Sequence, residues 1–182
     1  MIDETDRELY EYGLFMLLSN IFLLFVTIVF GIILDEIVGS IIFFFAFMLL
    51  RRFAGGYHAK TELRCQLSTT FLFALCIILI KFSHIINLFI PLVVVLMLST
   101  AVVLLCAPLD TPEKPLTRKE EIRYRIITYI ILGAIDVVIA LSIVFEIDFL
   151  TAPLEAAVIL ESFLLSIGKI AKENHYTKTQ LM

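Results

Sequence analysis

The sequence predicts an all-α, polytopic membrane protein, and three observations lead to this class. First, 60% of the 182 residues are hydrophobic and only 18% are charged, and the mean hydropathy is +1.00. Soluble domains are about 45–50% apolar and about 25% charged. Second, the apolar residues form long runs, and third, Lys and Arg are concentrated in alternate connections between these runs. This composition excludes a disordered chain. A net charge of −4 without a long basic run argues against nucleic-acid binding.

Six apolar runs define the predicted elements. A helix needs roughly 20 apolar residues to cross a bilayer core. Four runs reach this length. Each of the two 14-residue runs must recruit flanking residues, thin the bilayer or re-enter it. The runs lack the alternating pattern of strands, and unpaired backbone groups are excluded from lipid, so helices are expected. Only three of the 32 charged residues lie in the runs 14–34, 37–50, 67–80, 85–106, 126–145 and 149–168.

The basic residues predict the orientation. If all six runs cross, thirteen of the fourteen Lys and Arg residues share the side of the N-terminus, and Lys81 alone lies opposite. Because Lys and Arg favour the cytoplasm, both termini are expected there. The same split would survive if both short runs were re-entrant, so the number of spans is six or four. Residues 1–13 do not resemble a cleavable signal. They predict a cytoplasmic amphipathic helix, either at the interface or simply solvated.

We treat residues 1–182 as one domain with two cytoplasmic connections, 51–66 and 107–125. Three prolines make residues 107–116 a non-helical connector. Thr117 and Glu120 form a capping-box pattern that predicts a new helix. The basic residues after this cap, including Arg118 and Lys119, could bind an acidic peptide tail or anionic headgroups.

Segment 51–66, RRFAGGYHAKTELRCQ, is the polar part richest in residues suited to catalysis. A free thiol is mostly protonated at neutral pH, so a nucleophilic cysteine needs a base or a favourable field. A helix beginning near residue 62 would place Cys65 in its first turn, and His58 could act as the base. On one unbroken helix the two would stand about 10.5 Å apart. A dyad therefore requires the chain to fold back at Gly55-Gly56, or two subunits to share the site. A buried cysteine beside a headgroup-binding histidine remains the alternative.

The order R-x4-G-x-H-x6-C, formed by Arg51, Gly56, His58 and Cys65, closely resembles the signature of the accessory gene regulator B (AgrB) family. The text APLDTPEKPL at 107–116 is similar to that family's second cytoplasmic loop. The resemblance implies a cysteine endopeptidase of the bacterial cell membrane with its active site on the cytoplasmic side. It assigns Cys65 as nucleophile and His58 as general base, with supporting roles for Arg51 and Gly56. Gln66 is our guess for a third residue that orients His58.

The resemblance also implies a substrate. The family processes an autoinducer propeptide with an amphipathic leader, a central Cys or Ser and an acidic C-terminal tail. It cuts before the tail and closes the centre into a thiolactone or lactone. The resemblance further suggests a homodimer, which the sequence itself does not show. No cofactor is expected, and no metal-ligand spacing links the three histidines.

Three acids lie inside apolar runs, where an unpaired charge is costly. Asp136, Glu155 and Glu161 either line a polar cleft that binds the peptide or its leader, or are internally hydrogen-bonded packing groups. A rival interpretation makes them the pathway of a small peptide transporter, and another makes the protein a non-catalytic scaffold. Cys76 and Cys106 are expected to be packed apolar side chains.

Overall fold

The computed structural model consists of six helices and confirms the all-α class. Its described backbone covers residues 4–56, 62–83, 89–109 and 117–180, and its described side chains are those of residue 10 and residues 13–56, 66–83, 93–109 and 117–171. The helices are α1 (Glu4–Ile33), α2 (Ile37–Ala54), α3 (Glu62–Ser83), α4 (Phe89–Cys106), α5 (Arg118–Val144) and α6 (Asp148–Gln180).

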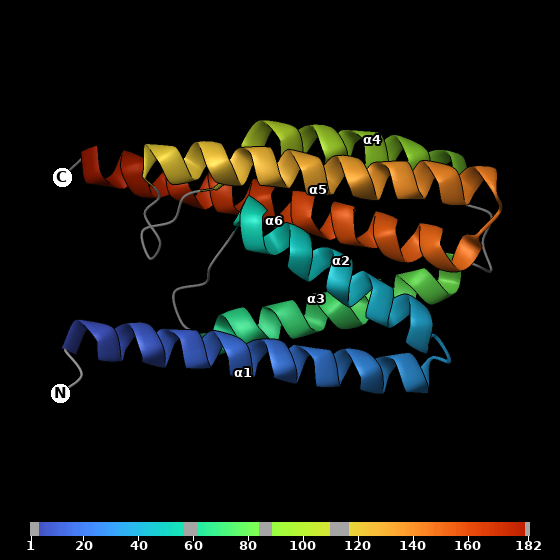
Figure 1. The fold of residues 1–182 in the computed structure, drawn as a ribbon, viewed down its shortest axis with the longest axis horizontal. Helices are drawn as coiled ribbons and strands as arrows, with labels where there is room; N and C mark the ends of the chain where they lie inside the picture. The colour runs from blue at the N-terminus through green and yellow to red at the C-terminus, as the bar shows by residue number, and fades with distance from the viewer. Residues whose placement is uncertain (1–3, 57–61, 84–88, 110–116, 181–182) are drawn as a thin grey trace.

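Successive helices run in opposite directions along one elongated bundle (Figure 1). The start of α1 and the end of α6 lie at the same end of this bundle. Five helices are long and apolar enough to cross a membrane, and α4 adds the shorter apolar helix Val93–Cys106. The chain is therefore a multi-pass membrane protein.

Both 14-residue runs lie inside longer helices. Helix α2 has 18 residues and α3 has 22, which correspond to about 27 and 33 Å at the rise of an α-helix. A bilayer core is about 30 Å thick. The two helices run in opposite directions along the bundle, so neither run forms a re-entrant turn in this structure (Figure 1). Of the three solutions considered for these runs, the structure uses recruitment of flanking residues.

The additional length corrects one predicted boundary. We expected the polar connection to begin at Arg51, but α2 continues through Arg51 and Arg52 to Ala54. The physical reason is that cations in the last turn of a helix are stabilised by its unpaired carbonyl groups. The separate prediction of a helix beginning near residue 62 is confirmed, because α3 begins at Glu62.

The ends of α1 and α5 test two further predictions. Helix α1 runs from Glu4 to Ile33 without interruption, so residues 4–13 continue into the first span instead of forming a separate helix. The capping box of α5 is confirmed. The Thr117 hydroxyl accepts a hydrogen bond from the Glu120 backbone N–H at 3.4 Å, and the Glu120 carboxylate accepts one from the Thr117 N–H at 3.0 Å.

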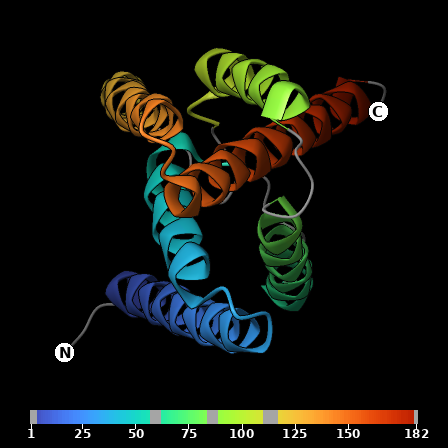
Figure 2. The same ribbon diagram turned by 90° about the vertical axis from the view of Figure 1, so that its right-hand side faces the viewer.

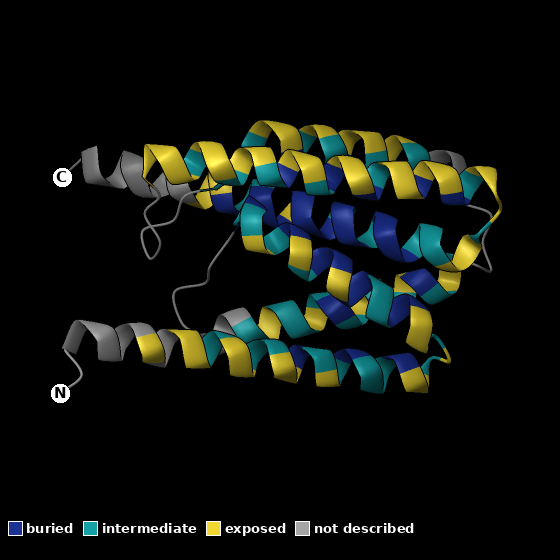
Figure 3. Cartoon of the chain, in the orientation of Figure 1, coloured by how far each residue is buried: buried dark blue, intermediate teal, exposed yellow. Residues whose placement is uncertain are grey.

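Helices α6 and α2 form the centre of the bundle. Figure 2 shows the other four helices arranged around them. In their apolar stretches, 56% of the residues of α6 and 44% of those of α2 are buried, against 17% for α1 and for α3. Figure 3 shows the same distribution, with buried residues concentrated on α6 and α2. The exposed apolar surfaces of the outer helices suit contact with lipid.

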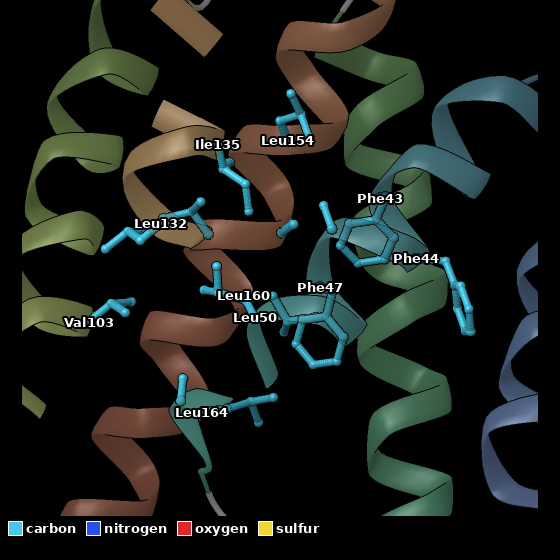
Figure 4. Packing of buried hydrophobic residues seen from close by; sticks show 14 of the residues in the cluster. Phe43, Phe44, Phe47, Leu50, Val103, Leu132, Ile135, Leu154, Leu160 and Leu164 are labelled. Carbon is cyan, nitrogen blue, oxygen red and sulfur yellow. The ribbon is translucent and has the colours of Figure 1, made fainter. Parts of the chain in front are cut away.

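Aromatic and leucine side chains fill this centre. The ring of Phe73 on α3 lies 4.8 Å from that of Phe43 and 5.1 Å from that of Phe47, both on α2. Leu50 of α2 and Leu160 of α6 belong to the same buried hydrophobic cluster (Figure 4). This packing fixes the end of α2 against the middle of α6, and the candidate site begins at that end of α2.

Candidate active site

The structure describes only part of the predicted catalytic pair. Cys65 is the fourth residue of α3, but its side chain lies outside the described set, and so does the whole of His58. Helix α2 ends at Ala54, and Gly55 and Gly56 follow in non-helical conformations. Residues 51–66 therefore do not form one continuous helix. The arrangement that would have excluded a dyad within one subunit is absent from the described part of this segment.

Two glycines end α2 for both conformational and spatial reasons. Gly55 has φ 76° and Gly56 has φ 136°, values that L side chains rarely adopt. A Cβ on Gly55 would lie 2.6 Å from the carbonyl oxygen of Leu109. A Cβ on Gly56 would collide with the guanidinium group of Arg51. Both positions therefore require glycine, and they turn the chain away from α2 just before the predicted catalytic segment.

Arg51 connects this turn to the centre of the bundle. Its Nη1 donates a hydrogen bond to the Gly55 carbonyl oxygen at 2.7 Å. The same nitrogen lies 3.7 Å from Oε1 of Glu161, which is fully buried on α6. Neither carboxylate oxygen of Glu161 accepts a hydrogen bond from the described residues. Burying a charge is costly unless it is paired, so Arg51 is the group that makes a charged Glu161 tolerable at this position.

The second cytoplasmic connection meets the first at the same place. The Leu109 N–H donates to the Ala54 carbonyl at 2.9 Å, and Leu109 forms a parallel bridge with Gly55. We call this group of residues the Arg51 cluster. It consists of Arg51, Gly55, Gly56, Leu109 and Glu161. It joins the end of α2, the middle of α6 and the segment after α4, and so fixes the backbone at Gly55 and Gly56.

The remaining predicted site residues lie elsewhere. Gln66 directs its side-chain Nε2 to the carbonyl oxygen of Ser19 on α1, at 3.4 Å. Arg118 and Lys119 are exposed in the first turn of α5. Glu155 is buried, with 3% of its surface exposed. Cys76 and Cys106 are half-buried free cysteines, which agrees with their expected role as packed side chains.

Asp136 does not share the partner of Glu161. The Thr100 hydroxyl, on α4, lies 3.2 and 3.3 Å from the two oxygens of the Asp136 carboxylate. This contact joins α5 to α4. The described contacts of the three intramembrane acids thus bring Glu161 to the predicted supporting residue Arg51, while Asp136 is bound by a different helix.

Sequence reasoning missed three of these contacts. It assigned Arg51 and Glu161 separate roles and did not identify Thr100 as the donor to Asp136 or Leu109 as the partner of Gly55. A signal existed for the first pair, because an acid in an apolar span requires a basic or hydrogen-bonding partner. Arg51 directly follows an apolar run and was therefore an available partner.

The fold and the cluster together define a multi-pass membrane protein with a polar group of residues at the end of the bundle that carries both termini. The family model for accessory gene regulator B matches residues 1–168. This chain belongs to the AgrB family. Membership of this family supports a role in the accessory gene regulator system and fits quorum sensing.

The chain is also similar to two curated relatives, at 27% and 25% sequence identity. The chain is 27% identical over 130 residues to "Putative AgrB-like protein 2" of Clostridium perfringens (strain 13 / Type A). It is 25% identical over 130 residues to "Putative AgrB-like protein" of Clostridium perfringens (strain SM101 / Type A). Each match covers 68% of this chain and 60% of the relative, so the chain spans less than two thirds of either protein. No solved structure matches the chain.

Proposed function

We propose that the protein is a membrane cysteine endopeptidase that cleaves the C-terminal tail from an autoinducer propeptide and cyclises the remainder. Cys65 is the nucleophile and His58 the general base. The observation that carries the proposal is membership of the AgrB family over residues 1–168, combined with the order Arg51, Gly56, His58 and Cys65.

The local backbone supports this assignment. Cys65 is in the first turn of α3, where the unpaired backbone N–H groups favour a thiolate. The break after Ala54 allows His58 to approach from outside that helix. Arg51 and Gly56, which the resemblance gave supporting roles, touch each other at this break. Arg51 thus maintains the turn, and Gly56 provides the space for its guanidinium group.

The reaction proceeds in two acyl transfers. His58 takes the thiol proton, and the Cys65 sulfur attacks the scissile carbonyl carbon. The tail leaves as an amine after receiving that proton, and the leader and centre remain as a thioester on Cys65. The thiol or hydroxyl of the precursor then gives its proton to His58 and attacks this thioester. The ring forms, the bond to Cys65 breaks, and the Cys65 sulfur takes the proton back from His58. Water would hydrolyse the intermediate, so a site at the membrane boundary favours cyclisation by limiting access of water.

The proposed site faces the cytoplasm of a bacterial cell. Thirteen of fourteen Lys and Arg residues are assigned to that side, which is the usual bias of membrane proteins. An acidic tail is attracted to such a surface, although salt screens the attraction beyond about 8 Å. Arg118 and Lys119 are exposed and available for this contact. A homodimer that shares the site between subunits is compatible with the same chemistry.

The direct test uses purified protein and a synthetic peptide with an amphipathic leader, a centre with one cysteine and an acidic tail. Intact-mass spectrometry should detect a peptide-derived acyl group on Cys65 and, later, a product lighter by the tail. Cys65→Ala and His58→Ala should each abolish both signals. Cys76→Ala is the matched control, since this cysteine lies on the same helix and should be dispensable.

Full turnover of the peptide by Cys65→Ala would overturn the proposal. The transporter alternative predicts a different pattern. Cells that express Cys65→Ala would still export an intact peptide, while loss of Asp136, Glu155 or Glu161 would stop export. Co-expression with the precursor, followed by mass analysis of cells and medium, separates these two functions.

A further inference from the structure

The most unusual buried group in the described structure is the carboxylate of Glu161. It is fully buried, neither oxygen accepts a hydrogen bond from the described residues, and its basic neighbour is Arg51 at 3.7 Å. A long distance of this kind, without a direct hydrogen bond, is a weak way to stabilise helix packing. The pair therefore calls for an explanation other than stability.

Arg51 provides that explanation, because one of its nitrogens serves two neighbours. Nη1 faces Glu161 on one side and donates to the Gly55 carbonyl on the other. The guanidinium group also fills the space where a Cβ of Gly56 would lie. A guanidinium is planar and rigid, so the position of one contact fixes the others. Arg51 thus links the carboxylate of Glu161 to the Gly55-Gly56 turn.

We propose that Glu161 is a positioning residue of the peptidase: through Arg51 it sets the backbone at Gly55 and Gly56, and so the direction in which the chain leaves α2 toward the catalytic segment. This inference rests on the proposed function. It replaces the earlier hypothesis that Glu161 binds the peptide, because Glu161 has no exposed surface and its carboxylate faces Arg51. Glu161 acts on geometry and does not touch the reacting atoms.

A single-turnover experiment tests the proposal. Glu161→Gln keeps the size of the side chain and removes the charge that holds Arg51. We expect the rate constant for acylation of Cys65 to fall by about 10- to 100-fold at saturating peptide, because displacements near 1 Å in a reacting group have effects of this order. The KM should change by less than about twofold, since a positioning residue acts on the reaction more than on substrate binding.

The amplitude of acylation separates positioning from folding. A residue needed only for stability would lower the fraction of molecules that react, with an unchanged rate constant in those that remain. Asp148→Asn is the matched control, because this acid is on the same helix and exposed at the opposite end of the bundle. Glu161→Asp, which keeps the charge, should react at a rate between those of the unaltered protein and Glu161→Gln.

The most specific test is whether the effects of Arg51 and Glu161 on the acylation rate depend on each other. If Glu161 acts only through Arg51, the double variant Arg51→Gln/Glu161→Gln should be no slower than Arg51→Gln alone. The double variant removes both charges of this pair, so it remains informative if Glu161→Gln folds poorly. Independent, multiplying losses of rate in the two single variants would overturn the inference.

Alkylation distinguishes failure of this inference from failure of the proposed function. In a background with Cys76→Ser and Cys106→Ser, the rate of Cys65 modification by iodoacetamide reports its activation without any peptide. An equal rate in His58→Ala would contradict the proposed dyad itself. If the alkylation rate falls in His58→Ala but not in Glu161→Gln, the dyad is supported and the positioning role of Glu161 is overturned. We expect both variants to slow alkylation.

Discussion

Gly56 shows how the absence of a Cβ in glycine shapes the start of the candidate active site. Its φ of 136° and the guanidinium of Arg51 beside it leave no room for a Cβ. The sequence pattern could predict that a glycine pair turns the chain. It could not predict that an arginine five residues earlier lies against that glycine, because this contact depends on the exact path of the helix end.

We predict that Gly56→Ala destabilises the protein by about 1–3 kcal/mol, the usual cost of a strained backbone conformation. It should also reduce acylation of Cys65, because the collision displaces Arg51. Thermal unfolding in detergent and intact-mass analysis would measure the two effects. Gly133→Ala is the matched control, since a Cβ there meets no atom within 4 Å and alanine favours a helix. Equal stability of Gly56→Ala and the unaltered protein would contradict the described geometry.

Asp136 provides a second case at the scale of single residues. Because the Thr100 hydroxyl lies within hydrogen-bonding distance of both carboxylate oxygens, an amide oxygen can accept the same bond. We therefore expect Asp136→Asn to retain precursor processing. Thr100→Val should weaken the contact between α4 and α5 by about 0.6 kcal/mol, and Thr100→Ser should not. Loss of processing in Asp136→Asn, with stability unchanged, would instead favour a peptide-binding cleft.

The helices themselves were largely predictable from the sequence. The apolar runs indicated all six helices, although two runs were too short to fix the number of spans, and Thr117 and Glu120 predicted where α5 begins. The end of α2 was misplaced because Arg51 and Arg52 were counted as part of the connection. Apolar runs define the part of a helix that lipid requires. They do not define how far the helix continues into the polar boundary, where charged side chains are also stable.

Helix packing was not predictable in the same way. Phe71 and Phe73 are both phenylalanines in the same apolar run, yet Phe71 is 69% exposed and Phe73 is fully buried against α2. In lipid both sides of a helix are apolar, so hydrophobic periodicity does not indicate which side faces a neighbour. The rotation of α3 is set by contacts with other helices, and these contacts are absent from any local pattern.

This difference yields a paired prediction. Phe73→Ala should destabilise the protein by about 3–5 kcal/mol, because it leaves a cavity among the rings of Phe43, Phe44 and Phe47. Phe71→Ala should cause no measurable change, since its ring faces the surroundings. Unfolding of the two variants in detergent, compared side by side, provides the measurement. Equal losses would show that the rotation of α3 is wrong.

At the scale of the whole molecule, the end of the bundle that carries the termini is predicted to face the cytoplasm. In a background without cysteines, we expect Glu146→Cys to react with a membrane-impermeant maleimide in intact cells. Arg118→Cys should react only after the cells are permeabilised. Both residues are exposed, so the difference reports the side of the membrane. The opposite pattern would reverse the orientation and remove the cytoplasmic assignment of the site.

The central position of α6 has a consequence for biosynthesis. Chains emerge from the ribosome in order, and α6 follows the other five helices. Until it is made, the nascent protein lacks one of its two central helices, and Glu161, the acidic neighbour of Arg51, has not yet been translated. The contact between Arg51 and Glu161, which joins the end of α2 to α6, therefore forms only after α6 has been translated.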